Sequence, residues 1–214
     1  MRILSIDASL NCPGFAVMDI IDGKVDLIMT TAVDNSHPPS KKHPKKSTAE
    51  KLQEIAGCFY RLLKQYEPDV IVRERGFSRH SATTQLLFRV VGVLDLVAIN
   101  NASKEIEEIP PKEVKLTMTG SGTADKTLVA TSLAYYVGQR PYVTDDESDA
   151  VAVGITYAIK NGLVETKLVK KVVRNSGRPK KGARPQRMVM PHENMRYRHV
   201  RRYSCRRSAR KRIV

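Results

Sequence analysis

Four acidic side chains stand where a site for divalent metal ions could form. Asp7 ends the apolar run RILSID, Glu74 ends the apolar run VIVRE, and Asp146 and Asp149 open an apolar stretch that continues to residue 159. Carboxylate oxygens are the hard ligands that Mg²⁺ and Mn²⁺ prefer. Two such ions about 4 Å apart can activate a water molecule and stabilise the leaving oxygen in phosphodiester hydrolysis. The four acids therefore predict a metal-dependent hydrolytic site, provided that the fold brings them together.

The acids near residue 146 also have a local explanation. Thr144 and Glu147 have the spacing of a capping box, which predicts that a helix begins there. Acids in a first turn complement the helix dipole, which is a sufficient reason for the presence of Asp145, Asp146 and Glu147. Asp149 fits this explanation less well, because it lies about a turn deeper and shares a face with Asp146, where like charges repel.

Asp7 and Glu74 have a structural alternative as well. Either acid could simply end a strand and pair with a nearby arginine, Arg2, Arg73 or Arg75. For either acid alone this ion-pair interpretation is favoured. The joint placement of the acids reverses the preference and favours a shared metal site.

The hydrophobic pattern predicts the elements that position these acids. Runs of apolar residues predict strands, and apolar residues three and four apart predict helices. Asp22-Gly23 predicts a hairpin, and Ser47 with Glu50 predicts a second capping box. The predicted strands are 2–8, 15–20, 24–33, 69–74 and 105–110, and the predicted helices are 47–65, 81–101, two short helices and 145–160.

This order of elements predicts an α/β fold. We expect a mixed five-stranded sheet, made of a three-strand antiparallel meander plus two parallel strands and flanked by helices. The carboxyl ends of parallel neighbours lie at one edge of a sheet, where binding sites form. Asp7 and Glu74 would meet at that edge.

The predicted helix 81–101 is apolar nearly all round, with leucine and valine on several faces. A helix of this kind is buried on more than one side, so we expect it to form a subunit interface. We expect that no apolar run in the chain is long enough to span a membrane. The N-terminus lacks the succession of regions that a signal peptide has.

The positive charge of the chain is concentrated at its end. The net charge is +15, but residues 170–214 hold 17 Lys or Arg and one acid, whereas residues 1–169 have a net charge of −1. Tyr197 and Tyr203 are interleaved with these arginines, which favours nucleic acid as the partner over a merely solvated or targeting segment. Such a composition cannot bury a core. We therefore predict a folded domain over 1–165 and a flexible, basic, nucleic-acid-binding tail over 166–214.

The cysteines predict an intracellular protein. Cys12, Cys58 and Cys205 are odd in number, far apart and without metal-ligand spacing. We expect reduced thiols and a cytoplasmic location.

Four blocks of the sequence resemble the RuvC family of Holliday-junction resolvases, particularly its phage-encoded members. They are IDASLNCPGFAV (6–17), ERGF (74–77), PKEVKLTMTGSGTADKTLV (111–129) and DESDAVAVGITYA (146–158). The third block is the most specific. Its residues on the family pattern are Val114, Lys115, Thr119, Gly120, Gly122, Ala124, Lys126 and Val129.

The resemblance implies an RNase H-like fold and a homodimer that nicks opposing strands of a four-way DNA junction. It implies two Mg²⁺ ions per active site, for which Mn²⁺ is a suitable substitute. By position, the catalytic and metal-binding acids of the family match Asp7, Glu74, Asp146 and Asp149, and its basic positions near the scissile phosphate match Lys115 and Lys126. For the two lysines, a solvated helix face is the alternative interpretation.

Phe77 matches an aromatic residue that the family inserts at the junction centre, although a core residue under a loop remains an equal alternative. An exposed aromatic side chain on a loop can stack on unpaired bases. The residues expected to contact DNA are Arg75, Phe77, Arg79, Lys112, Lys115, Lys126, Arg196, Arg198, Arg201 and Arg202.

The sequence departs from the family pattern in ways that bear on selectivity. Ala8-Ser9 replaces the usual Pro-Gly after Asp7, and Arg75, Arg79 and His80 make the loop around Phe77 more basic. Phosphate contacts add affinity without discriminating shape or sequence, so we expect branched DNA in general to be bound.

Two other classes of function share part of this pattern. An actin-like ATPase also begins with a strand-terminal aspartate and a glycine turn, but its duplicated domain would not fit in 214 residues. A non-catalytic architectural protein would use only the basic tail and would leave DNA strands whole.

Overall fold

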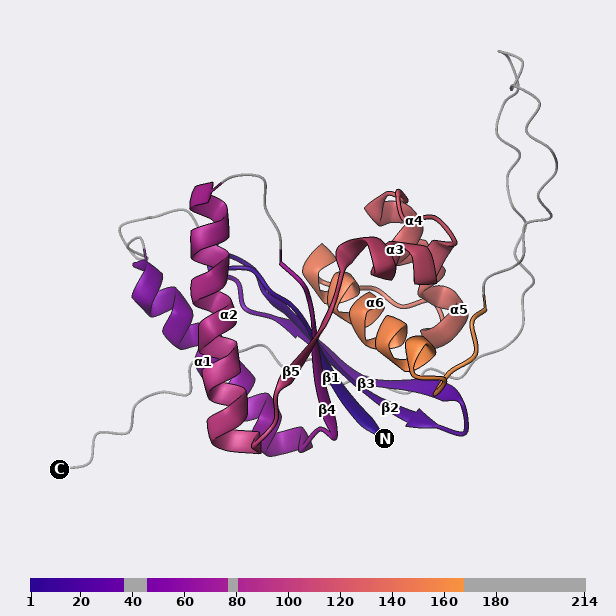
Figure 1. Ribbon diagram of the computed structural model, residues 1–214, viewed down its shortest axis with the longest axis horizontal. Coiled ribbons are helices and arrows are strands. Elements are labelled where there is room, and N and C mark those ends of the chain that lie inside the picture. Colours follow the sequence, from indigo (N-terminus) through magenta and orange to yellow (C-terminus); the bar gives the residue numbers. More distant parts are fainter. Residues whose placement is uncertain (37–45, 77–80, 168–214) are drawn as a thin grey trace, which may run out of the picture.

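The computed structural model describes residues 1–36, 46–76 and 81–167, and its elements surround a single sheet (Figure 1). The strand order is β3-β2-β1-β4-β5, in which β1, β2 and β3 are antiparallel neighbours and β1, β4 and β5 are parallel. The predicted mixed five-stranded sheet is therefore confirmed. The strands are β1 (Arg2–Asp7), β2 (Gly14–Ile21), β3 (Lys24–Ala32), β4 (Val70–Glu74) and β5 (Ile106–Ile109).

Helices cover both faces of the sheet. In Figure 1 α1 and α2 lie on one side, and α6 with the shorter helices α3, α4 and α5 lies on the other. The hydrophobic core is divided accordingly into two clusters, one under α1 and α2 and one under α6. The helices are α1 (Thr48–Tyr66), α2 (Ser81–Ala102), α3 (Pro111–Thr119), α4 (Lys126–Ser132), α5 (Ala134–Val137) and α6 (Asp145–Lys160).

Local sequence signals account for the bounds of several elements. Asp22 and Gly23 have φ angles of 50° and 70°, which the tight turn between β2 and β3 requires. Ser47 and Glu50 form the predicted capping box at the start of α1. α6 begins after Thr144, as predicted.

Two predictions about this part of the chain were wrong in detail. Three short helices, not two, lie between β5 and α6 among the described residues, because the segment after α4 closes one further turn as α5. The capping box of α6 is also only half formed. The Thr144 hydroxyl accepts a hydrogen bond from the amide of Glu147. The Glu147 carboxylate accepts hydrogen bonds from the Thr30 hydroxyl and the amide of Val143, and not from the amide of Thr144 as a full capping box requires.

α6 lies directly on the sheet because two glycines allow close contact. A β-carbon on Gly14 would lie 2.0 Å from the carbonyl oxygen of Asp146, and one on Gly154 would lie 2.4 Å from the terminal methyl carbon of Met18. Neither distance is compatible with an unshifted side chain. The glycine in β2 therefore fixes the start of α6 against the edge of the sheet where β1 ends.

In the single chain the helix over 81–101 is not buried on more than one side, and its expected burial in a subunit interface stays a prediction. α2 packs on α1 and the sheet through one stripe, in which Val90, Leu94 and Ala98 are fully buried. Leu87, Val91, Val93 and Val97 are half-buried beside this stripe. Other apolar side chains of α2 are exposed, Phe88 by 61% and Leu96 by 59%. The pattern could not separate these cases, because an apolar surface reads the same whether this chain or another covers it.

The length of this helix also corrects the expectation about membrane spans. Ala82–Ala102 is long and apolar enough to cross a bilayer by length and composition. The same stretch supplies buried side chains to the core beside α1, and its Asp95 carboxylate lies 3.6 Å from the guanidinium of Arg73. A helix that packs into a core passes the same test of length and composition as a membrane helix.

Candidate active site

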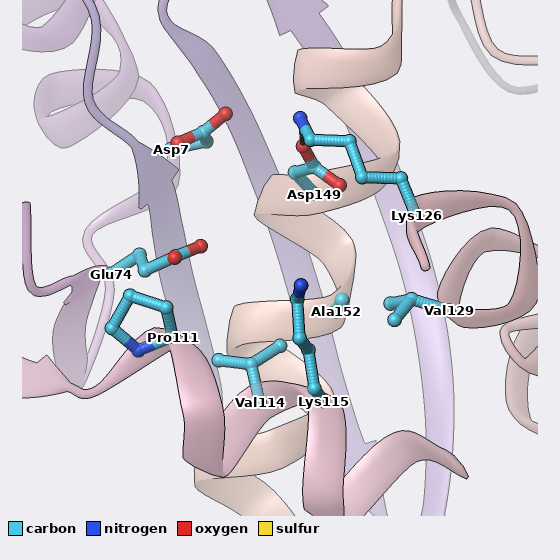
Figure 2. A pocket seen from close by; sticks show the side chains of 9 residues that line it. All are labelled: Asp7, Glu74, Pro111, Val114, Lys115, Lys126, Val129, Asp149 and Ala152. Carbon is cyan, nitrogen blue, oxygen red and sulfur yellow. Dashed lines mark hydrogen bonds and ion pairs between the residues drawn. The ribbon is translucent and has the colours of Figure 1, made fainter. Parts of the chain in front are cut away.

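Three of the four predicted acids line one cleft. Asp7 ends β1 and Glu74 ends β4, and the pairing of Ile6 with Arg73 places both acids at the same edge of the sheet. Asp149 faces them from the second turn of α6 (Figure 2). The cleft has a volume of about 140 Å³. Its other lining residues are Pro111, Val114, Lys115, Lys126, Val129 and Ala152.

The fourth acid, Asp146, is near the site but does not line this cleft. It is half-buried in the first turn of α6, and its negative charge contributes to raising the pKa of Asp7. Burial, and then Asp146, raises the pKa of the nearby Cys12 thiol to about 12. Asp145 is exposed to solvent.

The cleft carries more negative charge than the protein neutralises. Burial is the largest cause that raises the pKa of Asp7 to about 8, followed by the charges of Glu74, Asp149 and Asp146. Burial and then Asp149 also raise the pKa of Glu74. Like charges that share a low-dielectric site disfavour ionisation in this way. The site therefore favours a bound cation.

Two lysines reach into the cleft from the helices that cover it. The Nζ of Lys126 lies 2.6 Å from Oδ2 of Asp149, and Figure 2 shows this ammonium beside the Asp149 carboxylate. Lys115 lines the cleft from α3 on the side of Glu74, and its charge lowers the pKa of that acid. Both lysines therefore lie where the sequence predicted basic residues beside the acids.

The predicted arginine partners of Asp7 and Glu74 are engaged elsewhere. Arg2 donates to Asp19, with its Nε 2.8 Å from Oδ1 of that acid. Arg73 and Arg75 both pair with Glu108, at 2.6 and 2.9 Å. The structural ion-pair interpretation of Asp7 and Glu74 was therefore wrong, because strand alternation points both arginines away from the face that carries Glu74.

The donor set fits a hard divalent cation in kind and in charge. Asp7, Glu74 and Asp149 offer carboxylate oxygens, and the positive charges around them do not fully neutralise these acids. In the described part of the chain, no three acidic, histidine or cysteine side chains already surround a common point. One reason is visible in the geometry, since an oxygen of Asp149 is taken by Lys126.

Several predicted DNA-contacting residues have no described position. Phe77 and Arg79 lie outside the described residues, as do the tail arginines Arg196, Arg198, Arg201 and Arg202. Arg75 is exposed beside β5, where Glu108 holds it. Lys112 is exposed on α3, and its stem lies against Gly122.

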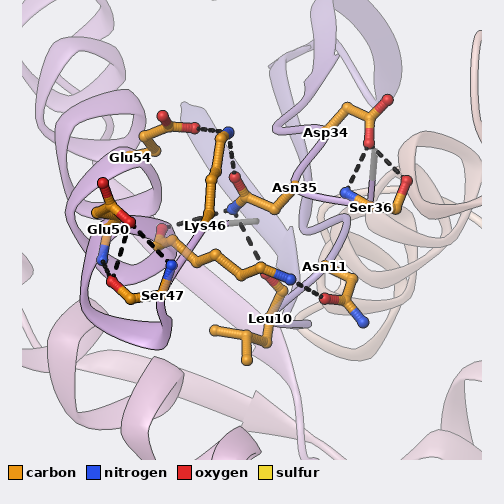
Figure 3. A network of polar contacts seen from close by, with 10 residues as sticks. Leu10, Asn11, Asp34, Asn35, Ser36, Lys46, Ser47, Glu50 and Glu54 are labelled. Carbon is orange, nitrogen blue, oxygen red and sulfur yellow. Dashed lines mark hydrogen bonds and ion pairs between the residues drawn. The ribbon is translucent and has the colours of Figure 1, made fainter. Parts of the chain in front are cut away.

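A polar network beside the cleft was not predicted from the sequence. Asn35 is 4% exposed, and its backbone amide donates to the carbonyl of Asn11 at 2.7 Å. Its side chain accepts from Lys46 at 2.8 Å and donates to the carbonyl of Leu10 (Figure 3). Lys51 adds a bond to the side chain of Asn11. The network fastens the turn that follows Asp7 to the start of α1.

Glu108 is a second residue that sequence reasoning missed. It stands in β5 and binds Arg73 with one carboxylate oxygen and Arg75 with the other. These arginines flank Glu74 in the chain, so Glu108 fixes the strand end that presents Glu74 to the cleft. Its place among the three glutamates of the pattern EIEEI gave no signal of this role, because the pairing depends on the neighbouring strand.

Comparison with known proteins agrees with this geometry. The family model "Crossover junction endodeoxyribonuclease RuvC" matches residues 3–157. Proteins of that name from two Prochlorococcus marinus strains, NATL1A and NATL2A, are 30% and 29% identical over 157 residues, covering 73% of this chain and 97% of each relative.

The fold is also similar to a solved relative. Thermus thermophilus RuvC in complex with a Holliday junction substrate superposes with a TM-score of 0.65 at 21% identity, covering 75% of this chain and 94% of that chain. This likeness supports the RNase H-like fold that the resemblance to the RuvC family implied. On the family match, the chain belongs to the RuvC family of crossover junction endodeoxyribonucleases.

Proposed function

We propose that this protein is a metal-dependent endodeoxyribonuclease that resolves Holliday junctions. The observation that carries the proposal is the cleft in which Asp7, Glu74 and Asp149 meet beside Lys115 and Lys126. Family membership supports the same activity over the actin-like ATPase and the non-catalytic architectural protein. The reaction is hydrolysis of a phosphodiester, in which water adds to phosphorus and one P–O bond breaks.

The four acids, Lys115 and the apolar walls of the cleft each have a role in this proposal. Asp7, Glu74, Asp146 and Asp149 hold two Mg²⁺ ions, and Mn²⁺ can take their place. When bound, such ions supply Lewis-acid chemistry to the water and to the leaving oxygen. Lys115 orients the phosphate from the side of Glu74. The apolar walls formed by α3 and α4 limit the access of bulk water to the reacting group.

We also propose a homodimer that uses the exposed face of α2. Phe88, Leu96 and Ile99 are exposed by 61%, 59% and 49%, and they lie on a helix that is otherwise fixed to the core. Burial of such a face is favourable at roughly 25 cal/mol per Å² of apolar surface. Two cleavage sites in one dimer suit paired nicks on opposing strands.

The basic end of the chain supports binding to branched DNA in general. Residues 166–214, which we propose as a nucleic-acid-binding tail after the nuclease domain 1–165, extend beyond the described residues, which end at 167. Contacts with phosphates fall in number when these residues are removed, so truncation at about residue 170 should weaken binding and flatten its salt dependence. Cleavage on saturating DNA should largely persist.

A cleavage assay on a labelled synthetic four-way junction tests the proposal. Wild-type protein should nick the junction with Mg²⁺ and not with a chelator. Asp7→Asn should abolish cutting and keep binding, whereas Asp26→Asn, on an exposed position of β3, should behave as wild type. Strands that stay whole under every condition would instead support the architectural protein.

The breadth of the substrate range needs a separate comparison. Junctions, Y-forks and plain duplex should be tested at several salt concentrations, with forks cleaved at rates comparable to junctions. Cleavage of junctions alone would contradict the proposed breadth and leave the nuclease activity intact.

A further inference from the structure

Lys126 is the cationic side chain most closely engaged with the acids of the cleft. It is the first residue of α4, and its Nζ lies 2.6 Å from Oδ2 of Asp149 on α6. The side chain of Asp149 is only 16% exposed, whereas that of Lys126 is 70% exposed. The contact therefore joins a fixed carboxylate to a long side chain that extends from solvent.

The charge of Lys126 acts on more of the site than its contact with Asp149. It lowers the pKa of Asp7 and of Glu74, and the acids Asp149, Asp7 and Asp146 raise its own pKa. Lys115 differs, because it lines the same cleft without an ion pair to an acid in the described part of the chain.

We propose that Lys126 is the internal counter-ion of the metal-free site and competes with the divalent cation for Asp149. The inference rests on the proposed function in one respect, namely that the acids of the cleft bind the metal. In the metal-free protein the ammonium holds the acids together. When Asp149 binds an ion instead, Lys126 is released and becomes available to the phosphate of the DNA.

The chemistry of the two cations explains why the exchange can occur. A lysine ammonium is a compact single charge on a flexible stem, so it partly neutralises the cluster and leaves at a small cost. A divalent ion neutralises more charge and binds several carboxylate oxygens at once. Lys126 therefore prevents mutual repulsion among the acids but lowers the apparent affinity for metal.

Calorimetric titration of the DNA-free protein with Mn²⁺ tests this role without using catalysis. Lys126→Met should bind Mn²⁺ about tenfold more tightly than wild type, which corresponds to about 1.4 kcal/mol. Lys126→Gln provides the same comparison if the first variant does not fold. Without metal, either variant should unfold at a lower temperature than wild type, and Mn²⁺ should remove most of the difference.

Two control variants separate competition from a general loss of positive charge. Lys115→Met removes a charge from the same cleft without freeing Asp149, so affinity should rise by at most about threefold. Lys160→Met breaks an ion pair between the last residue of α6 and Glu113 of α3, whose charged atoms are 2.9 Å apart. This pair lies outside the cleft, so the affinity for Mn²⁺ should not change. In nitrogen-edited spectra, the ammonium signal of Lys126 should move when metal is added to the wild type.

The possible results separate the counter-ion role from the proposed function. If the wild type binds Mn²⁺ and Lys126→Met binds it no more tightly, the counter-ion role is overturned and the proposed function stands. The counter-ion role is equally overturned if Lys115→Met raises affinity as much as Lys126→Met. If the wild type binds no Mn²⁺ and cuts no junction, both the proposed function and the counter-ion role are overturned.

Discussion

Gly14 and Asp146 are in direct backbone contact, because a β-carbon on Gly14 would lie 2.0 Å from the carbonyl oxygen of Asp146. Gly14 also pairs with Asp7 across β1 and β2. One glycine thus sets the separation between the strand that ends on Asp7 and the helix that carries Asp146 and Asp149. The site depends on this contact as much as on the acids themselves.

Gly14→Ala should therefore separate the acids. The added methyl group must push α6 away from β2, which should destabilise the protein by about 1–3 kcal/mol and weaken Mn²⁺ binding. Gly154→Ala is the matched control, because its methyl group meets the side chains of Met18 and Ser5 rather than backbone atoms and lies farther along α6. Thermal unfolding and Mn²⁺ titration of both variants measure the two effects. Equal losses of metal affinity would show that Gly14 has no special role.

Glu108 should be required for the placement of Glu74. Glu108→Ala leaves the buried guanidinium of Arg73 with the more distant carboxylate of Asp95, so we expect a loss of about 3 kcal/mol in the free energy of unfolding. At a temperature where the variant is folded, its cleavage rate should fall while junction affinity is kept. Glu105→Ala, at an exposed position before β5, is the control. An unchanged rate in Glu108→Ala would refute this link.

The exposed face of α2 predicts the oligomeric state. Phe88→Glu places a charge on the proposed interface and should convert the dimer to a monomer in sedimentation experiments, with little effect on the unfolding of the single chain. Ile21→Glu changes a similarly exposed apolar residue at the end of β2 and should leave the dimer intact. If both variants sediment like wild type, the interface lies elsewhere.

The raised pKa of Asp7 predicts how stability depends on pH. In the folded protein Asp7 has a pKa of about 8, against an ordinary pKa of 3.8 for an aspartate, so it keeps its proton at pH values between the two. The folded state therefore binds more protons than the unfolded state across this window, and stability must fall as pH rises through it. The loss is at most about 1.4 kcal/mol per pH unit. In thermal unfolding at a series of pH values, Asp7→Asn should flatten this dependence, and Mg²⁺ should offset it most at high pH.

Much of the architecture could be predicted because its signals are local. The hairpin at Asp22-Gly23, the cap at Ser47 and the start of α6 after Thr144 each depend on residues a few positions apart. The meeting of Asp7 with Glu74 followed from the parallel pairing of two strands that both end on an acid.

The remaining features depend on contacts between distant segments. The exposure of Phe88 could not be predicted, because an apolar helix looks the same whether its own chain or a partner covers it. The pairing of Lys126 with Asp149 and of Glu108 with two arginines depends on side-chain positions across elements, for which the sequence carries no periodic signal. Asp146 lies beside the cleft rather than in its wall for the same reason.

Anomalous diffraction from crystals soaked in Mn²⁺ tests most directly whether the acids of the cleft form a metal site. Anomalous peaks are predicted within coordination distance of Asp7, Glu74 and Asp149, and these peaks should be lost in Glu74→Gln crystals. Peaks at other positions only, or the same peaks in the Glu74→Gln crystals, would contradict the claim that these carboxylates form a metal site.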